Sequence, residues 1–396
     1  PLSTPSVNRI LGTEISTKQI KAYLKNLELD VREEGEERLS VTPPSFRGDL
    51  ERGIDLIEEV ARLDGYEKIP LTLPKGPPSP EEMSRELILE QKAKDLLIQQ
   101  GYYEVVTYSF TAPLSLNGLS LSPDDPRRQC LPILNPLTAD SSVLRTSLIP
   151  GLMETARYNL SHKNVNLRIF ELKKVYLPEE GERLPKEVKY LTGLAMGRNG
   201  EIHWASSVRQ VDFYDVKGCI EDLFEFLQVK GVTFDRTEDI PYLHPGKSSK
   251  ILLGEGVLGV VGEVHPETLS HYEIPGKAYL FEINFDRMVK DAVEERKFRP
   301  LPKFPVVHRD LSLVVEDHLE AEKVEEAIRL LEQPFIDEVK LFDVYRGVPV
   351  PQGKKSISYR IRYQASDRTL TDDEVNQYHE KVISRLREVF KAELRG

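Results

Sequence analysis

The sequence predicts an α+β protein built from several domains, and three observations indicate this class. The chain has 396 residues, enough for about two or three domains. Residues 70–80 contain five prolines, and proline fixes φ and lacks a backbone N–H, so this stretch is expected to be an extended linker. The remaining strand-like and helix-like segments lack the regular β–α–β repeats of a parallel sheet. We therefore expect domains at residues 1–75, 76–298 and 299–396.

Composition and charge restrict the class of protein further. Hydrophobic residues make up 39% and charged residues 30% of the chain, as in ordinary globular proteins. No apolar run approaches the roughly 20 residues of a membrane span, and no signal peptide is visible. Cys130 and Cys219 are isolated from each other, so we expect reduced thiols and a cytoplasmic location. A net charge of −11 argues against a protein that coats nucleic acid, so neither DNA nor a membrane is an expected partner.

The first domain is expected to be a winged-helix-like module. Ser16 or Thr17 can cap a helix that reaches Leu27, with its apolar residues on one face. Two short strands should follow, near residues 29–32 and 39–42, and the acidic stretch between them contains Gly35, as a hairpin loop would. A second helix is predicted from about Leu50 to Leu63.

The second domain is expected to contain an antiparallel sheet flanked by helices. A helix from about residue 84 to Gln100 should end at Gly101. The other predicted helices span residues 148–159 and 215–227. Strands are predicted at 104–110, 167–176, 190–196, 250–253, 257–264 and 278–285.

The third domain is expected to have a ferredoxin-like fold. Its segments follow the order strand (310–315), helix (321–331), strand (336–345), strand (356–363), helix (372–390) and short strand (392–395). This βαββαβ order is the pattern of that fold.

Four acidic residues in the first domain form the sharpest chemical pattern: Asp49, Asp55, Glu58 and Glu59. Asp55 is separated from the two glutamates by three and four residues, so on a helix these side chains share a face. Carboxylates without His or Cys suit a hard cation such as Mg²⁺. From the residues alone, a solvated acidic face at a helix N-terminus is the favoured interpretation, and a Mg²⁺ site is the alternative.

The third domain carries a local basic stretch. Residues 340–368 contain seven Lys or Arg against two Asp. On a strand, Arg360 and Arg362 share one face, and Tyr359 and Tyr363 share the other. Basic side chains can hold phosphates while an exposed ring stacks on a base; alternatively, the tyrosines belong to the core and the bases form a solvated sheet face.

Four strings, in order along the whole chain, resemble the β subunit of bacterial phenylalanine–tRNA ligases. The first two are PPSFRGDLERGIDLIEEVARLDGY (Pro43–Tyr66) and NPLTADSSVLRTSLIPGL (Asn135–Leu152). The third is LHPGKSSKI (Leu243–Ile251) with GVVGEVHP (Gly259–Pro266). The fourth is KFPVVHRDLSLVV (Lys303–Val315) with the later SDRTLTDDEV. The resemblance identifies the chain as the C-terminal portion of such a subunit, lacking its N-terminal tRNA-binding and editing modules, so we expect no hydrolysis of mischarged tRNA.

This resemblance implies specific roles for the three domains. The second resembles a class II synthetase core that has lost catalysis, so no catalytic residue is expected in this chain; Arg145 and Arg157 would join a subunit interface or internal packing. The α subunit of an α2β2 heterotetramer would hold the active site and bind ATP. Asp49, Asp55, Glu58 and Glu59 would bind Mg²⁺ shared with α. The third domain would bind the anticodon end of phenylalanine tRNA, with contacts expected from Arg309, Tyr345, Arg346, Arg360 and Arg362.

Two rival functions remain open at this point. The chain could be a free-standing RNA-binding or assembly module that works without an α subunit. It could also be a Mg²⁺-dependent hydrolase that uses the carboxylates between Asp49 and Glu59, although no companion base, nucleophile or phosphate-binding loop accompanies them. His244 and His265 lie at turns without further ligands at metal-binding spacing, so we expect them to stabilise those turns.

Overall fold

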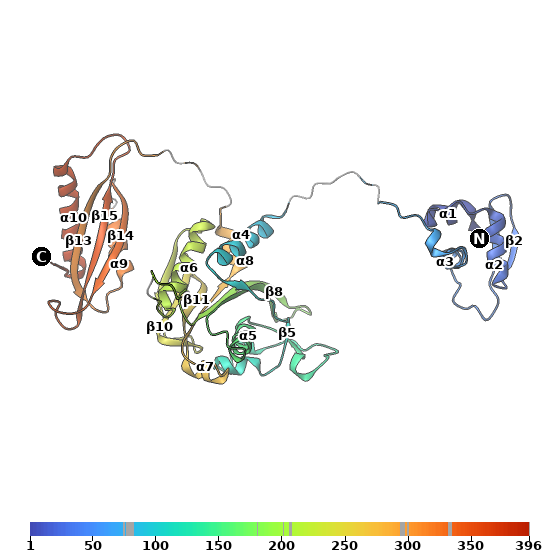
Figure 1. Cartoon of the computed structure of the whole chain (residues 1–396), viewed down its shortest axis with the longest axis horizontal. Helices are drawn as coiled ribbons and strands as arrows, with labels where there is room; N and C mark the ends of the chain where they lie inside the picture. Colours follow the sequence, from blue (N-terminus) through green and yellow to red (C-terminus); the bar gives the residue numbers. More distant parts are fainter. Residues whose placement is uncertain are drawn as a thin grey trace. The chain divides into compact units, whose positions relative to one another are not determined.

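A computed structural model describes residues 1–73, 76, 83–179, 181–200, 202–205, 208–293, 298, 301–331 and 335–395. The chain divides into two compact units, Pro1–Ser84 and Arg85–Gly396. Each unit is described by itself (Figure 1). The predicted proline-rich linker lies mostly outside the described residues, and the proposed division into three domains stays a prediction.

The first unit holds a three-stranded sheet and three α-helices in its described part. Its elements are β1 (Leu2–Ser3), α1 (Thr4–Leu11), α2 (Thr17–Asn26), β2 (Asp30–Glu33), β3 (Arg38–Thr42) and α3 (Gly53–Asp64). The hairpin β2–β3 and the helices α2 and α3 confirm the predicted elements. Ser16 caps the start of α2 with a capping box. The Ser16 hydroxyl accepts a hydrogen bond from the Gln19 backbone N–H, and the Gln19 side chain accepts one from the Ser16 backbone N–H. The winged-helix assignment itself stays a prediction.

The second unit contains a seven-stranded sheet in the order β4-β7-β8-β12-β11-β10-β9. Its strands are β4 (Tyr103–Glu104), β7 (Leu167–Leu177), β8 (Lys186–Met196), β9 (Val232–Arg236), β10 (Leu243–Leu253), β11 (Gly256–Val264) and β12 (Ala278–Asn284). All neighbours pair antiparallel except β4 and β7. The predicted antiparallel sheet is therefore confirmed, although β9 was not predicted.

Helices cover both faces of this sheet (Figure 1). One buried cluster joins the sheet to α4 (Arg85–Gln99), α6 (Phe213–Phe226) and α8 (Phe285–Asp291). A second cluster joins the opposite face to α5 (Ile149–Ser161) and α7 (Pro266–His271). Residues that alternate along each strand enter the two clusters in turn, as Ile169 and Phe170 do.

The strand predicted at residues 104–110 is wrong in extent. The chain leaves the large sheet after β4 and pairs again only at β5 (Phe110–Thr111), which forms a separate two-stranded sheet with β6 (Val143–Leu144). Between them, the N–H and hydroxyl of Thr107 donate to the buried Glu171 carboxylate at 3.1 and 2.7 Å. The apolar sequence predicts continuous strand pairing over this segment. In the structure, these two hydrogen bonds to Glu171 hold the segment instead.

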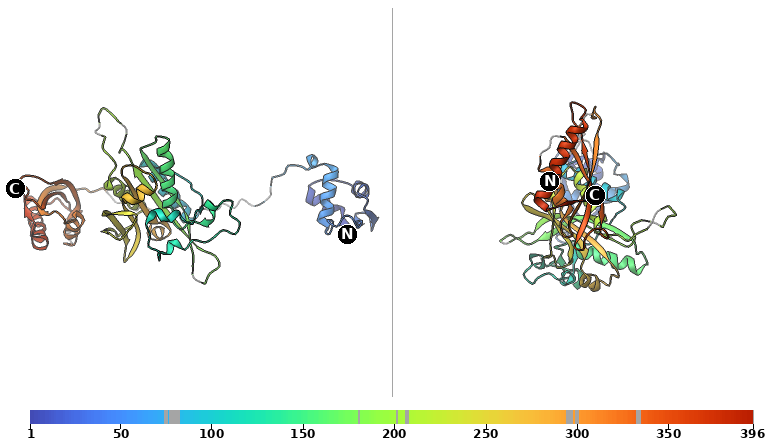
Figure 2. Two further views of the ribbon diagram at one scale, coloured as in Figure 1. Left: turned by 90° about the horizontal axis from the view of Figure 1, so that it is seen from below. Right: turned by 90° about the vertical axis from the view of Figure 1, so that its left-hand side faces the viewer.

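The C-terminal part of the second unit is a four-stranded sheet in the order β14-β15-β13-β16. Its elements are β13 (Val307–Glu316), α9 (Ala321–Arg329), β14 (Ile336–Tyr345), β15 (Lys354–Tyr363), α10 (Asp372–Phe390) and β16 (Glu393–Leu394). The βαββαβ order confirms the ferredoxin-like prediction. The two helices pack on one face of the sheet (Figure 2). One buried cluster of side chains joins them to it.

Candidate metal and RNA-binding sites

The acidic set is held by the first turn of α3 and the loop before it. Asp55 is the third residue of α3, and its Oδ2 accepts hydrogen bonds from the backbone N–H groups of Arg52 and Glu51 at 2.7 and 3.1 Å. The carboxylate therefore caps the helix N-terminus, where backbone donors have no helical partners. These bonds, led by the one from Arg52, lower the pKa of Asp55 below its usual value.

Arg47 links two other members of the set. Its guanidinium donates to the Asp49 carboxylate through Nε at 3.0 Å and Nη2 at 2.7 Å, and Nη2 also donates to Glu59 Oε1 at 2.7 Å. Arg62 donates to the other Glu59 oxygen. The hydrogen bond from Arg47 lowers the pKa of Asp49. Burial acts to raise the pKa of Glu59, but the hydrogen bonds from Arg62 and Arg47 outweigh it and the net shift is downward.

The predicted metal residues therefore do not lie together as four free carboxylates. Arg47 brings Asp49 and Glu59 together, Asp55 is used at the helix N-terminus, and Glu58 is exposed. Across the described part of the chain, no group of three or more His, Cys, Asp or Glu residues is arranged to hold a metal ion. Arg47 was not singled out from the sequence, although it lies only two residues before Asp49.

Arg360 and Arg362 share the face of β15 opposite the buried Tyr359 and Tyr363, as predicted, but both are ion-paired. Arg360 makes a two-pronged contact with Asp310 on β13, with both distances 2.7 Å. Arg362 contacts Asp337 and Glu338 on β14, the latter at 3.2 Å. The charge count between residues 340 and 368 missed these acids because neighbouring strands supply them from outside that segment.

The other predicted RNA contacts are spread over different surfaces. Arg309 projects toward α10, where it donates to Asp372 at 2.8 Å and to Asn376. Arg346 pairs with Asp317 at 2.6 Å. Tyr345 is 37% exposed, its hydroxyl donates to the Val348 carbonyl at 2.9 Å, and the Arg395 guanidinium lies 4.9 Å from its ring centroid. The structure therefore brings Arg360 and Arg362 onto one face but does not bring Arg309 there.

Tyr359 and Tyr363 belong to the core of the C-terminal domain. Both side chains are fully buried in its main cluster. The Tyr359 hydroxyl donates to the Ala321 carbonyl at 2.9 Å, and that of Tyr363 lies 3.1 Å from His379 Nδ1. The interpretation of these two rings as core residues is confirmed.

A row of polar side chains crosses one face of the seven-stranded sheet. Glu171, Thr192 and Glu282 are cross-strand neighbours on β7, β8 and β12, and all three are buried. Arg145 donates to Glu171 at 3.0 Å, whereas Glu282 accepts a hydrogen bond of 3.1 Å from Ser147. A cavity of about 440 Å³ opens beside this row, and Arg145, the arginine in its lining, is already paired. Arg145 thus serves internal packing, one of its two expected roles.

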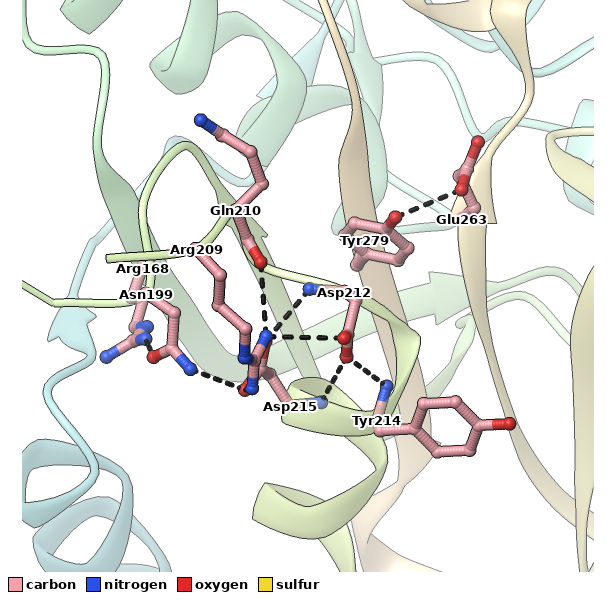
Figure 3. Close-up of polar contacts among 9 residues, drawn as sticks. All are labelled: Arg168, Asn199, Arg209, Gln210, Asp212, Tyr214, Asp215, Glu263 and Tyr279. Atoms are coloured by element: carbon pink, nitrogen blue, oxygen red, sulfur yellow. Dashed lines mark hydrogen bonds and ion pairs between the residues drawn. The ribbon is translucent and has the colours of Figure 1, made fainter. Parts of the chain in front are cut away.

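A second polar cluster lies at the N-terminus of α6 (Figure 3). Arg209 makes two contacts of 2.6 Å with the Asp215 carboxylate and one of 3.2 Å with Asp212, which caps the helix. Asn199 donates to Asp215 at 2.7 Å and accepts from Arg168. The two arginines and the two aspartates of this cluster balance in charge. Their hydrogen bonds hold the segment before α6 against the start of that helix.

Of the two histidines expected at turns, His265 lies at the start of α7, whereas His244 lies within strand β10. His265 Nδ1 accepts from the Glu267 N–H at 3.2 Å and caps α7. His244 Nδ1 accepts from the Gly246 N–H at 3.0 Å. The His265 ring therefore stabilises the turn that begins α7, as predicted, and the His244 ring instead holds the irregular backbone of β10, which corrects the prediction for that residue. No helix in the described part of the chain is long and apolar enough to cross a membrane.

Comparison with protein families gives three matches in sequence order. Residues 1–66 match the tRNA synthetase B5 domain. Residues 69–285 match the phenylalanyl tRNA synthetase beta chain CLM domain. Residues 302–395 match the ferredoxin-fold anticodon binding domain. Together the matches cover nearly the whole chain.

Individual relatives agree with these matches. The phenylalanine–tRNA ligase beta subunit of Syntrophotalea carbinolica is 40% identical over 397 aligned residues, covering 100% of this chain and 49% of the relative. That of Geobacter sulfurreducens is 39% identical, covering 96% and 47%. The chain spans about half the length of the curated relatives it matches. A solved pyrrolysyl-tRNA synthetase from Desulfitobacterium hafniense covers 69% of this chain and 88% of its own with 16% identity and a TM-score of 0.41, a likeness too weak to argue from.

Proposed function

This chain belongs to the phenylalanyl-tRNA synthetase β-chain family, and we propose from this premise that it acts as part of the β subunit of a phenylalanine–tRNA ligase. That enzyme joins phenylalanine to its tRNA at the expense of ATP. The observation that carries the proposal is the ordered match of three synthetase domains over one continuous chain. Its proposed partners are the α subunit, in an α2β2 heterotetramer, and phenylalanine tRNA, which places its work in the cytoplasm.

Catalysis is proposed to reside in the α subunit, which also binds ATP. The central sheet of this chain supports that division of labour, because hydrophobic clusters cover both of its faces. The segment Tyr279–Arg287 has no glycine between its ends, whereas a nucleotide that approaches the backbone closely favours glycine. The Arg145 guanidinium is ion-paired with Glu171, and that of Arg168 donates to the Asn199 side chain.

The proposed Mg²⁺ site involves Asp49, Asp55, Glu58 and Glu59 together with the α subunit. Carboxylate oxygens suit a hard cation. However, Arg47 holds Asp49 and Glu59, and Asp55 is bound to backbone N–H groups. In this arrangement the four residues do not fit a shared cation while Arg47 stays between two of them.

The C-terminal domain is proposed to bind the anticodon end of the tRNA. The family match to an anticodon-binding domain supports this role. The exposed face bearing Arg360 and Arg362 supplies cations, and Phe342, 51% exposed beneath Arg360, adds an aromatic surface. Such faces can combine phosphate contacts with base stacking.

Mixing the chain with an α subunit tests the proposal. We expect a complex whose mass, measured by light scattering after gel filtration, equals two copies of each subunit. The complex should retain tRNA with an affinity that falls as salt rises, since phosphate contacts release counterions. A chain that binds tRNA but never associates with α would instead support the free-standing module, and hydrolysis of phosphoesters by the chain alone would support the hydrolase.

A further inference from the structure

The position of Arg47 conflicts with a simple cation site on the acidic set. Its guanidinium contacts one carboxylate on each side, Asp49 at 2.7 Å and Glu59 at 2.7 Å. The side chains of Arg47 and Glu59 are only 21% and 13% exposed. An arginine that bridges two carboxylates in this way neutralises them and occupies the space between them.

The neighbouring arginines do not share this arrangement. Arg52 pairs with Asp55 alone and is 76% exposed. Arg62 pairs with Glu59 alone and is 48% exposed. Arg47 is thus the most enclosed of the three guanidiniums and the one of the three that spans two members of the set.

We propose that Arg47 is the built-in counter-cation of the acidic set, and that it keeps divalent cations off Asp49 and Glu59 until the guanidinium is displaced. Arg47 and a divalent cation compete for the same oxygens, because Nη2 hydrogen-bonds to both Asp49 and Glu59. A dication would also be repelled by a guanidinium only a few ångströms away. Cation binding therefore requires an event that moves Arg47, and contact with the partner subunit is the event that the proposed function supplies.

This inference rests on the proposed function for the displacing partner, but its central claim concerns the chain alone. The probe is Mn²⁺, whose binding to the full chain is measured by electron paramagnetic resonance, with Mg²⁺ added as competitor. Wild-type chain should bind Mn²⁺ weakly. Arg47→Gln should bind it at least about tenfold more tightly, since one positive charge beside a dication has been removed.

Matched variants separate this mechanism from a general change in charge. Arg52→Gln removes the same charge from a residue close to the acidic set, at the N-terminus of α3, yet leaves the Arg47 bridge intact, and should gain less than about threefold. Combining Arg47→Gln with Asp49→Asn should abolish the gain. Arg47→Lys keeps the charge and should stay near wild type. Equal gains from Arg47→Gln and Arg52→Gln would overturn the proposal.

A second measurement covers the case in which Arg47→Gln fails to fold, as judged by circular dichroism. Wild-type chain and the double variant Asp49→Asn/Glu59→Gln should then bind Mn²⁺ with the same low affinity, because in the wild type those carboxylates are held by Arg47. Tight wild-type binding that the double variant loses would overturn the proposal. Neither experiment contains α or tRNA, so its failure is distinct from a failure of the chain to assemble.

Discussion

Two glutamates on the same sheet face occupy different electrostatic surroundings. Glu171 is fully buried and accepts hydrogen bonds from Arg145 and Thr107. Glu282 is also buried, but its hydrogen bond comes from the neutral Ser147 hydroxyl. Burial raises the pKa of Glu282, and the nearby Arg127 offsets this only in part. The difference between the two sites leads to two separate predictions.

The first prediction concerns the buried ion pair. Arg145→Ala leaves the Glu171 charge uncompensated inside the protein, which costs about 3–5 kcal/mol of unfolding free energy. Arg157→Ala, on α5, is the matched control because its pair with Glu154 is half-exposed, and it should cost less than about 1 kcal/mol. Urea denaturation followed by circular dichroism measures both. A loss for Arg145→Ala no larger than that of the control would contradict the prediction.

The second prediction concerns the pH dependence that Glu282 contributes. Its pKa in the folded chain lies above the unfolded value of about 4.5, so the unfolded chain releases the proton first as pH rises. The contribution of Glu282 to stability is thus fully present below that value and declines as pH rises toward the folded pKa. Glu282→Gln should remove this decline and be the more stable protein at pH 8. The exposed Glu255→Gln serves as control, and denaturation midpoints that fall with pH equally in all three proteins would argue against it.

At the scale of single residues, sequence patterns predicted the kind of role that a residue plays better than the residues that it contacts. His265 was correctly expected to stabilise a turn, whereas His244 lies in β10 and accepts from the Gly246 N–H there. Arg47 was not singled out from the sequence because its bridging contact depends on Glu59. Glu59 lies twelve residues away along the chain and comes close to Arg47 only after α3 forms. The acids opposite Arg360 and Arg362 were missed for the same reason, since strand pairing brings them together.

At the scale of elements, some segments were predicted with their full bounds, whereas others, such as the short helix α1, were missed. The bounds of β14 and α10 agree with the prediction, and in α10 the buried residues repeat at helix spacing. Helix α1 was not predicted, although Ser3 caps it and Pro5 lies in its first turn. It is only eight residues long, so it offers few repeats of the apolar pattern.

The exposed face of β15 yields a prediction at this scale. Arg360 forms an ion pair with Asp310, so Asp310 partly neutralises the charge that Arg360 could offer to an RNA phosphate. Asp310→Asn should free it, strengthen tRNA binding by the assembled α–β complex, and steepen the salt dependence by about 0.7–0.9 in log affinity against log salt. Arg360→Ala should act in the opposite direction on both quantities.

A matched control for this face lies on α10. Asp373→Asn changes the charge by the same amount, but Asp373 belongs to a helix that packs on the opposite face of the sheet. Its effect should be limited to a small, long-range increase in affinity that vanishes at high salt. If both aspartate variants change affinity and salt slope equally, Arg360 does not contact the RNA directly.

At the scale of the whole chain, three synthetase-domain matches follow one another in sequence order, and contacts within the chain hold Arg145 and Arg168 at the central sheet. The sequence predicted the ferredoxin-like domain because its six elements appear in order with clear periodicity. It could not predict which residues contact Arg145 and Arg168, since these partners, Glu171 and Asn199, lie 26 and 31 residues away along the chain. This arrangement bears directly on whether the chain can act alone.

The last prediction is that the purified chain does not catalyse phenylalanine-dependent ATP–pyrophosphate exchange. That reaction requires a site where cationic groups hold the phosphates and a carboxylate attacks the α-phosphorus. Here a hydrophobic cluster covers one sheet face, the other face carries the buried polar row, and Arg145, which lines the adjoining cavity, is neutralised by Glu171. Exchange measured with radiolabelled pyrophosphate should equal that of a preparation from cells with empty vector. Adding α to the same sample tests whether the assay conditions support exchange. Exchange by the chain alone, above the vector control, would mean that the central domain itself activates the amino acid.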